Sequence, residues 1–418
     1  MGVKPGYKQT EVGVIPEDWV INSLASVSET SSGTTPPRAM TERYFSNGTV
    51  SWVKTLDLNN SNIETTEECV TEEALKETSL RIYPEGSVLV AMYGGYNQIG
   101  RTGLLQIPAT VNQAITAIRP DSAALIPEYL IRVLNYRVDY WRSVASSSRK
   151  DPNITSSDVR RFQLACPEII EQELIAAALS DADVLVESLE QLLVKKRHIK
   201  QGAMQELLTG KKRLSGFSGK WRNCPWGDVI ASCSSGATPY RGRTEYYKGT
   251  VKWISSGELN FNVIEDTIEH ISEEAVHNTN LKVHSSGTFL MAITGLEAAG
   301  TRGSCGIVGS PATTNQSCMA IYPKPDLKTE YLYHYYVYRG NELAFEYCQG
   351  TKQQSYTAKL VKLLPIDLPP SIDEQAAIAA VLSDMDAEIA TLETKLTKAR
   401  QLKTGMMQEL LTGRIRLL

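Results

Sequence analysis

The side chains that could carry out chemistry are scattered through the 418 residues without the spacings that known reactions require. The seven cysteines are odd in number and include no Cys-x-x-Cys pair, which favours reduced thiols over disulfides or zinc ligands. His270, His277 and His284 recur at intervals of seven, but no cysteine or carboxylate stands at ligand spacing beside them. We therefore expect no metal site and no disulfide framework in this chain.

Motifs for catalysis or nucleotide binding are missing as well. Residues 295–302 have the glycine spacing of a phosphate-binding loop but lack its lysine. The sequence has no G-x-S-x-G turn, no H-E-x-x-H, no strand-linked G-x-G-x-x-G and no Asn-Pro-Pro-aromatic tetrapeptide of amino-methyltransferases. Glu393-Thr-Lys395 resembles the end of a nuclease motif, but its helical context favours a solvated helix face. A chain of this size without a catalytic or cofactor-binding site is better interpreted as a binding protein than as an enzyme.

Two segments combine basic and aromatic residues, as nucleic-acid-binding surfaces often do. Residues 132–161 carry a local charge of +4 with interleaved Tyr and Trp, and residues 339–362 carry +2 with Tyr347 and Tyr356, directly after Tyr338. Such strips can neutralise phosphates while Arg, Asn and Gln reach base edges. The alternative is that they are ordinary solvated helix faces.

The whole-chain composition is that of a globular protein with weak net charge. There are 43 Lys+Arg against 47 Asp+Glu, a formal charge of −4, which at first argues against a nucleic-acid partner. The N-terminal segment has no apolar core of a signal peptide, and the apolar run 174–179 is far shorter than the ~20 residues that span a bilayer. The expectation is a cytoplasmic protein that does not enter a membrane.

An internal repeat determines the expected organisation. Residues 171–214 reappear as residues 374–417, with about 25 of the 44 aligned positions identical. Shorter matches join the preceding parts: SSGTTPPR (31–38) with SSGATPYR (234–241), residues 63–94 with 264–295, and PATVNQA (108–114) with PATTNQS (311–317). The chain is therefore expected to hold two copies of a unit of about 200 residues, each a globular part followed by a long helix.

Both long helices show apolar residues in alternating steps of three and four. The positions of this seam are Ile175, Leu179, Val186, Leu189 and Leu193 in the first copy, and Ile378, Leu382, Met385, Ile389, Leu392 and Leu396 in the second. A period of 3.5 is typical of a coiled coil rather than of the broader face of a core helix. Since each stripe needs a cover, we expect two rods of about 60 Å to pair antiparallel within one chain. Pairing between two chains is the alternative.

The globular parts alternate short strand patterns with turn-rich stretches and short helices. The expected fold class is α+β: two mixed α/β domains with curved sheets, separated by two long antiparallel coiled-coil helices in a pseudo-twofold internal repeat. The expected bounds are 1–165 for the first domain, 166–215 for the first helical spacer, 216–368 for the second domain and 369–418 for the second spacer.

Several segments together resemble the specificity subunit of type I restriction–modification systems. They are the opening GYKQTEVGVIPEDW, the junction LPPSIDEQAAIAAVLSDMDAEI, and the two endings KQGAMQELLTGKKRL and KTGMMQELLTGRIRL. The resemblance covers nearly the whole chain in the family's order, and the doubled MQELLTG with its helix start is highly specific. The first junction, Cys166-Pro-Glu, is a weaker version of the Leu-Pro-Pro pattern that Leu368-Pro369-Pro370 retains.

This resemblance implies a DNA-binding chain that is not catalytic by itself. Each recognition domain would read one half of a bipartite, asymmetric site in double-stranded DNA, and the helices would set the gap between the halves. The helices would also dock two adenine-N6 methyltransferase subunits, and restriction subunits would join them. S-adenosylmethionine, ATP and Mg²⁺ would then be bound by those partner subunits, with no cofactor in this chain.

Divergent, polar loops are where two related domains would read different targets. The predicted DNA-binding residues are Arg38, Tyr93, Asn97, Gln98, Arg101, Arg149 and Lys150 in the first domain, and Arg241, Arg243, Arg302, Lys352, Gln353 and Gln354 in the second. The pairs 112–113 and 315–316, Asn-Gln in both copies, are left out because their identity indicates scaffold. Open alternatives are a methyltransferase-only or type II-like system, an adaptor joining two other macromolecules, and an enzyme whose site the sequence does not show.

Overall fold

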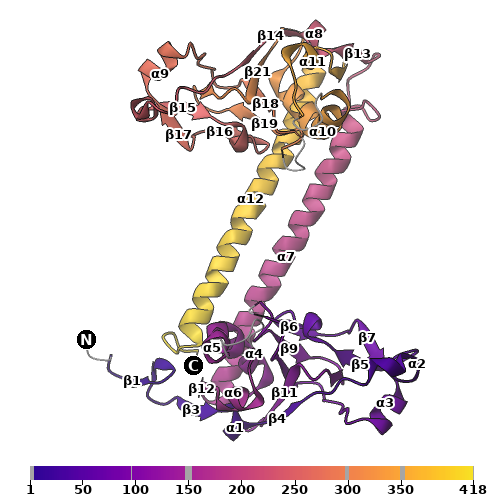
Figure 1. Cartoon of the computed structure of the whole chain (residues 1–418), viewed down its shortest axis with the longest axis vertical. Coiled ribbons are helices and arrows are strands. Elements are labelled where there is room, and N and C mark those ends of the chain that lie inside the picture. Colours follow the sequence, from indigo (N-terminus) through magenta and orange to yellow (C-terminus); the bar gives the residue numbers. More distant parts are fainter. Residues whose placement is uncertain (1–3, 96, 146–152, 297–300, 349–353, 418) are drawn as a thin grey trace. The chain divides into compact units, whose positions relative to one another are not determined.

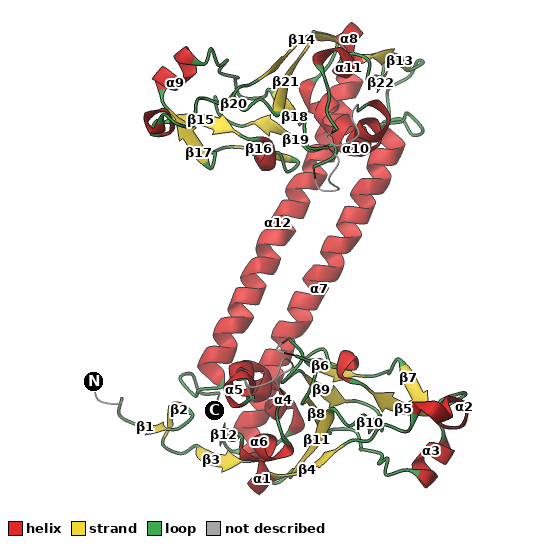
Figure 2. Ribbon diagram, in the orientation of Figure 1, coloured by secondary structure: helices red, strands yellow, loops and turns green. Residues whose placement is uncertain are grey.

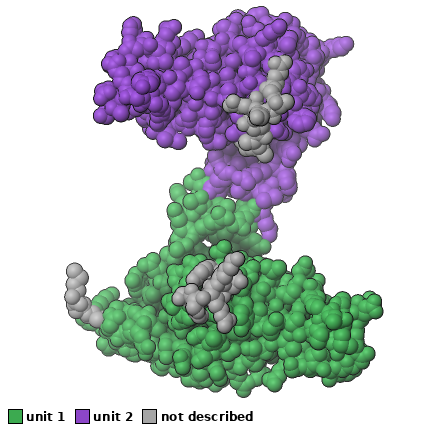
Figure 3. All heavy atoms as spheres, viewed as in Figure 1, with its two compact units in different colours: residues 1–190, 394–418 green, residues 191–393 purple. Residues whose placement is uncertain are grey.

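The computed structural model describes residues 4–95, 97–145, 153–296, 301–348 and 354–417. The chain divides into two compact units, shown in Figure 3: unit 1 holds residues 1–190 and 394–418, and unit 2 holds residues 191–393. Each unit therefore combines one globular copy with part of its own long helix and part of the helix that follows the other copy.

A five-stranded sheet forms the centre of unit 1, in the order β4-β11-β8-β9-β6. Its strands are β4 (Ser28–Ser32), β6 (Ser61–Ile63), β8 (Val88–Ala91), β9 (Thr102–Leu105) and β11 (Ile115–Pro120). All pairs are antiparallel except β6 with β9, which is parallel. β8 and β9 are buried along their whole length. The side chains on one face of the sheet pack in one apolar cluster, and those on the other face pack in a second cluster. Both sheet faces are therefore covered, which explains why these strands read as continuous apolar runs.

Shorter elements surround this sheet. A second sheet has the order β10-β5-β7, and two further strand pairs are β1 with β2 and β3 with β12. The elements are β1 (Tyr7–Thr10), β2 (Gly13–Pro16), β3 (Val20–Ser23), α1 (Leu24–Val27), η1 (Arg38–Met40), α2 (Thr41–Tyr44), β5 (Val50–Val53), η2 (Thr55–Asp57), β7 (Glu68–Val70), α3 (Glu72–Glu77), β10 (Thr110–Val111), α4 (Pro127–Tyr136), α5 (Val138–Val144), α6 (Ser156–Arg161) and β12 (Gln163–Cys166). In α4, Pro at the first position favours the helix start, and the buried Tyr129 hydroxyl donates to the Ala165 carbonyl (2.8 Å).

Unit 2 repeats this arrangement, as the ribbon in Figure 2 shows. Its five-stranded sheet has the order β14-β21-β18-β19-β16 and its smaller sheet the order β17-β15-β20, while β13 pairs with β22. The elements are β13 (Arg222–Pro225), α8 (Trp226–Val229), β14 (Ile230–Ser235), η3 (Thr244–Tyr247), β15 (Val251–Ile254), η4 (Ser256–Glu258), β16 (Asn262–Ile264), β17 (Glu269–Ile271), α9 (Glu273–Asn278), β18 (Phe289–Ala292), β19 (Cys305–Val308), β20 (Thr313–Thr314), β21 (Cys318–Pro323), α10 (Thr329–Tyr347), α11 (Ala358–Val361) and β22 (Pro365–Leu368).

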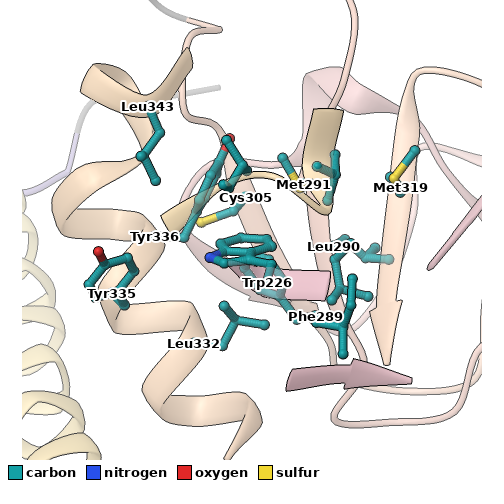
Figure 4. Close-up of a cluster of buried hydrophobic side chains, with 14 of the residues drawn as sticks. Trp226, Phe289, Leu290, Met291, Cys305, Met319, Leu332, Tyr335, Tyr336 and Leu343 are labelled. Atoms are coloured by element: carbon teal, nitrogen blue, oxygen red, sulfur yellow. The ribbon is translucent and has the colours of Figure 1, made fainter. Parts of the chain in front are cut away.

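The core of unit 2 is built around Trp226, which Figure 4 shows between α10 and the sheet. Its ring lies 5.7 Å from that of Tyr336 and 6.4 Å from that of Phe289, both in edge-to-face contact. All three side chains are fully buried. The core therefore joins α10 to the sheet and holds the strands whose loops are considered below.

Each long helix, α7 (Ile169–Leu207) and α12 (Ile372–Leu410), has 39 residues, and the two pair within each unit (Figure 1). In unit 1, Asp183 of α7 binds Lys403 of α12, and Glu190 binds Arg400 (2.6 Å). Positions rise along one helix as they fall along the other, so the helices run antiparallel. This confirms the expected pairing within one chain.

Unit 2 has the same ion pairs at an offset of 203 residues. Lys200 binds Asp386, and Arg197 binds Glu393 (2.6 Å), which correspond to the two pairs of unit 1. A third match lies at the helix ends. The buried Glu171 of unit 1 binds Arg416, and the buried Glu374 of unit 2 binds Arg213. The internal repeat therefore extends to individual charged side chains.

The seam residues have two different environments. Ile175 and Leu179 belong to the core of unit 1, and Ile378 and Leu382 to the core of unit 2, so these helix ends are core helices rather than coiled coil. The expectation that the period excludes a core face was wrong at these ends, because the globular part supplies the cover there. The remaining positions are half-buried or buried on the paired helices: Val186, Leu189, Leu193, Met385, Ile389, Leu392 and Leu396.

Candidate nucleic-acid interface

Three loops of unit 1 meet at one end of its five-stranded sheet. β4 and β8 end there, and β11, which is antiparallel to both, begins there. The Gly33 N–H donates to the Ile115 carbonyl (3.1 Å), and the Met92 N–H donates to the Ala114 carbonyl (2.8 Å), which ties the loops together. We call this sheet end the loop end of unit 1, and it comprises residues 33–38, 92–95, 97–101 and 112–114.

The loop after β8 carries four of the predicted DNA-binding side chains. Tyr93 is 44% exposed, and Asn97 is exposed beside it. The Arg101 Nε–H donates to the Asn97 carbonyl (2.9 Å), which fixes the guanidinium over the turn. A Cβ at Gly94 would overlap the Gln98 amide, so Gln98 folds back over the glycine turn. The structure thus places Tyr93, Asn97, Gln98 and Arg101 on one loop, with the side chains of Gln98 and Arg101 held against the loop backbone.

This loop is anchored in the core of unit 1. Gly100 has φ +76°, and a Cβ there would overlap the ring of Trp141, a fully buried residue of α5. Ile99 is also buried beside it. Since a larger residue at position 100 would push the loop off the core, glycine there positions the exposed residues that precede it.

Arg38 lies between two aromatic rings and one carboxylate. Its guanidinium lies 4.2 Å from the ring of Phe45 and 5.2 Å from that of Trp52, and its Nη2 binds Glu68 (2.7 Å). Hydrogen bonds from Lys54 and from Arg38 lower the pKa of Glu68, so this carboxylate stays ionised. Half of the Arg38 side chain remains exposed, which allows a further anionic contact.

Arg241 repeats this arrangement in unit 2. Its guanidinium lies 4.3 Å from the ring of Tyr247 and 5.2 Å from that of Trp253, and it makes two hydrogen bonds to Glu269 (2.6 and 2.7 Å). The Arg241 hydrogen bonds lower the pKa of Glu269, and Glu269 raises the pKa of Arg241. Because both units share this sandwich, Arg38 and Arg241 are suited to a contact common to both rather than to discrimination between targets.

The corresponding loop of unit 2 gathers Arg302 and Gln354. The Arg302 Nε–H donates to the Leu296 carbonyl (3.0 Å), and the Gln354 carbonyl accepts the Leu296 N–H (3.3 Å). The Arg302 guanidinium lies 5.7 Å from the ring of Phe345, whose side chain is 72% exposed. An exposed aromatic ring beside an oriented arginine is a surface on which a base or phosphate can rest.

The remaining predicted residues are not part of these groups. Arg243 donates to the Tyr246 hydroxyl (2.9 Å) and binds Glu274 (2.7 Å), so it braces η3 against α9. Arg149, Lys150, Lys352 and Gln353 lie outside the described residues.

The sequence analysis left out the Asn-Gln pairs 112–113 and 315–316, and the glutamine of each pair makes the same polar contact in its unit. The Thr35 hydroxyl donates to Oε1 of Gln113, and the Thr238 hydroxyl donates to Oε1 of Gln316 in unit 2. Both glutamines are exposed, so this contact turns each amide nitrogen outward as a donor. The signal in the sequence was the identity of the two copies, which indicates a shared contact.

The expectation of an exposed basic and aromatic strip at 132–161 was wrong for several of its members. Arg132 binds Asp183 of α7, and Arg137 stacks on Phe162 at 4.9 Å; burial lowers the pKa of Arg137. Trp141 is fully buried. These side chains join α4 and α5 to the rest of unit 1, because the apolar faces of the two helices carry the aromatics into the core.

A groove of about 1040 Å³ in unit 1 lies between β6, α4 and α7. Its lining includes Glu64, Glu128 and Glu173, all exposed, and Asp183 with its cationic partners Arg132 and Lys403. The excess of carboxylates makes this groove unsuitable for a phosphate backbone. This groove is therefore not a candidate for the path of a DNA backbone.

Within the described ranges, no group of three His, Cys, Asp or Glu side chains is arranged to hold a metal ion. A search of the same residues for a helix long and apolar enough to cross a membrane finds none.

Comparison with known proteins identifies the family. The family model for the type I restriction modification DNA specificity domain matches residues 16–195 and again residues 219–401. The chain belongs to this specificity family. The two matches coincide with the two copies of the repeat, so each copy is one specificity domain.

Named relatives agree with this assignment. The specificity chain is 30% identical over 187 residues to the type I restriction enzyme MjaIX specificity subunit of Methanocaldococcus jannaschii, an alignment covering 44% of this chain and 42% of the relative. It is 24% identical over 197 residues to the EcoR124I/EcoR124II specificity subunit of Escherichia coli, covering 47% and 46%. These alignments span less than half the length of either relative.

A solved structure matches the fold of the specificity chain over nearly its whole length. It is the crystal structure of the type I restriction–modification S subunit from M. genitalium, with a TM-score of 0.62 and 13% sequence identity, covering 97% of this chain and 98% of that one. The mixed α/β fold with two long helices is therefore the fold of a type I S subunit.

Proposed function

We propose that this chain is the DNA-specificity subunit of a type I restriction–modification complex. Each unit reads one half of a bipartite, asymmetric site in double-stranded DNA. The chain performs no catalysis by itself; it directs partner subunits to the sequence that they modify or cleave.

The observation that carries this proposal is a shared framework with unshared loops. Both units hold the same sheet orders, the same arginine sandwich and the same Thr–Gln contact. The segments that follow β8 and β18 in the sequence, residues 93–107 and 294–310, differ in length and side chains, including those around Arg101 and Arg302. Oriented Arg, Asn and Gln side chains are the groups that discriminate base edges in the major groove, so different loops favour different half-sites.

The paired helices would set the spacing between the half-sites and dock two methyltransferase subunits. Support comes from the matched ion pairs, which appear in both units and would present equivalent surfaces to two identical partners. S-adenosylmethionine would be bound by the methyltransferase subunits, and ATP and Mg²⁺ by restriction subunits.

Mapping of methylated adenines in the host genome, with and without this gene, tests the proposal. The expected result is the loss of methylation at one asymmetric sequence made of two specified halves and an unspecified gap. Unchanged methylation at every adenine motif would contradict the proposed function.

Substitution of the two loop arginines tests which unit reads which half. Arg101→Ala should relax the sequence requirement in one half-site only, and Arg302→Ala in the other, each by about 1–3 kcal/mol of discrimination. Arg142→Ala, an exposed arginine of α5 paired with Asp139, is the control and should leave both halves unchanged. Equal loss at both halves after either loop substitution would indicate a folding defect instead.

A further inference from the structure

A groove of about 540 Å³ runs beside β4 in unit 1. Its base includes Ser31 and Tyr83, whose hydroxyl groups are hydrogen-bonded to each other (2.9 Å). β4 is an edge strand, and β11 is its one partner among the described strands. Backbone groups on the outer edge of β4 can therefore add donors to those of the side chains.

The charged residues that line the groove are mainly cations. Arg81, Arg119 and Arg160 come from three different parts of unit 1, and Glu29 is the one carboxylate among the groove residues. Glu29 binds Arg119, which stands opposite it on β11. Arg81 and Arg160 are exposed, and neither has an acidic partner among the described residues. Two positive charges thus remain for an anion.

This groove continues from the loop end of unit 1. Ser32, the last residue of β4, is hydrogen-bonded through its hydroxyl to that of Ser156 at the start of α6 (3.0 Å). Arg160 lies one helical turn further along α6. A chain of negative charges that touches the loop end can therefore pass directly into the groove.

Unit 2 carries cations at the corresponding places beside β14, which is also an edge strand. His284 and Tyr83 hold equivalent places, since each forms an isolated antiparallel β-bridge, with Ala312 and Ala109 respectively. Lys282 precedes His284 by two residues, as Arg81 precedes Tyr83. The Lys282 Nζ lies 3.8 Å from the ring of Tyr322, the strand neighbour that replaces Arg119.

The second cation of unit 2 is Lys362, which directly follows α11 as the counterpart of the α6 arginines. The Gly227 N–H of α8, the helix that leads into β14, donates to the Lys362 carbonyl (2.9 Å), which places Lys362 beside the start of that strand. Lys282 and Lys362 are both exposed, and neither has an acidic partner among the described residues.

We propose that the sugar-phosphate backbone of bound DNA runs along β4 in unit 1 and along β14 in unit 2, held by Arg81 and Arg160 and by Lys282 and Lys362. This inference rests on the proposed function and adds the path of the backbone to it. The occupant is a polyanion because the available groups are cations and hydroxyls, and it is read without regard to sequence because both units provide it.

The test compares two double variants of the full chain, Arg81→Gln with Arg160→Gln and Lys282→Gln with Lys362→Gln. The control is Lys76→Gln with Lys195→Gln, which removes the same charge from exposed positions on α3 and α7. Each protein is titrated onto a duplex that the wild type selects from a random pool and onto a scrambled duplex, between about 50 and 200 mM salt.

Each groove variant should reduce the slope of log affinity against log salt by about 1.8, since each lost phosphate contact removes about 0.9. At about 0.1 M salt this corresponds to roughly 60-fold weaker binding. The loss should be equal on both duplexes, so that the preference for the selected duplex is retained. The control should keep the wild-type slope.

Three outcomes would overturn the inference: a slope equal to that of the control, a loss confined to the selected duplex, or normal DNA binding with lost assembly of a partner protein. The last would assign the groove to an acidic protein segment. Failure of the proposed function would be seen in a different measurement. A wild-type chain that selects no duplex from the random pool would contradict that function, whereas the salt dependence of binding to the scrambled duplex would still test the groove.

Discussion

Replacement of Arg416 by Ala should destabilise unit 1 strongly, because it would leave a buried carboxylate without its cation. The Glu171 side chain is 3% exposed, and Arg416 binds both of its oxygens (2.6 and 2.8 Å). The Trp19 indole N–H also donates to it (3.1 Å), but carries no charge. The same arginine makes two hydrogen bonds to Asp18, which is 62% exposed.

These exposures set the expected magnitudes. Removing one partner of a buried ion pair costs about 3–5 kcal/mol, since the remaining charge has lost its compensation. An exposed pair contributes about 0–1 kcal/mol. Arg416→Ala should therefore cost about 3–5 kcal/mol, whereas Asp18→Ala, which removes the exposed partner of the same guanidinium, should cost less than about 1 kcal/mol. Glu171→Gln combined with Arg416→Ala should recover part of the loss, because no buried charge remains.

Hydrogen exchange measured by mass spectrometry can assign the loss to one unit. Arg416→Ala should increase exchange at the start of α7 and in the core of unit 1, and leave unit 2 near the wild type. Arg213→Ala is the matched variant, since Arg213 binds the buried Glu374, and it should affect unit 2. Equal stability of Arg416→Ala and Asp18→Ala, or equal loss in both units, would refute the reasoning.

Three further predictions concern burial and backbone conformation. Burial lowers the pKa of His284 and of His334 from 6.5 to about 4, so the unfolded state binds protons that the folded state does not. Unit 2 should therefore lose stability as pH falls from about 6.5 to 4; protection factors in unit 2 that stay constant over this window, after correction for the intrinsic pH dependence of amide exchange, would contradict this. Gly413→Ala should lower the free energy of unfolding more than Gly210→Ala does, although both glycines have φ near +67°. A Cβ at position 413 would lie 2.5 Å from a proline ring, whereas a Cβ at position 210 would lie 3.1 Å from an indole ring, so equal unfolding midpoints would contradict this. Trp226→Ala should lower the stability of unit 2 by about 3–5 kcal/mol, because it removes a fully buried ring. Trp226→Phe should cost clearly less, since the buried indole N–H has no hydrogen-bond partner among the described residues. Equal losses of stability would show that ring volume is not the main contribution.

The sequence predicted the repeat, the α+β class and the antiparallel pairing because all three depend on long-range regularity in residue type. It did not distinguish coiled coil from core along the helices. Leu179 and Leu193 have the same seam pattern, yet one packs in the core of unit 1 and the other on the paired helix. Periodicity records that a face is covered, not what covers it.

The candidate site was predicted in part. Arg101 and Arg302 were predicted to bind DNA because their loops diverge, and the structure shows that the Nε–H of each donates to a carbonyl of its own loop. The sandwich around Arg38 depends on strand register in the smaller sheet, which short strands do not reveal from sequence. The basic strip was misread because local charge does not show which arginines, such as Arg137, turn inward.

The formal charge of −4 is compatible with DNA binding because many carboxylates are neutralised within the units. Glu68, Glu171 and Glu374 each bind arginines of the same unit, so they contribute little field beyond their partners. Among the exposed cations, Arg81 and Arg160 lie together beside β4. A chain built this way should bind random DNA weakly and rely on a few phosphate contacts for its path and on the loop arginines for its sequence.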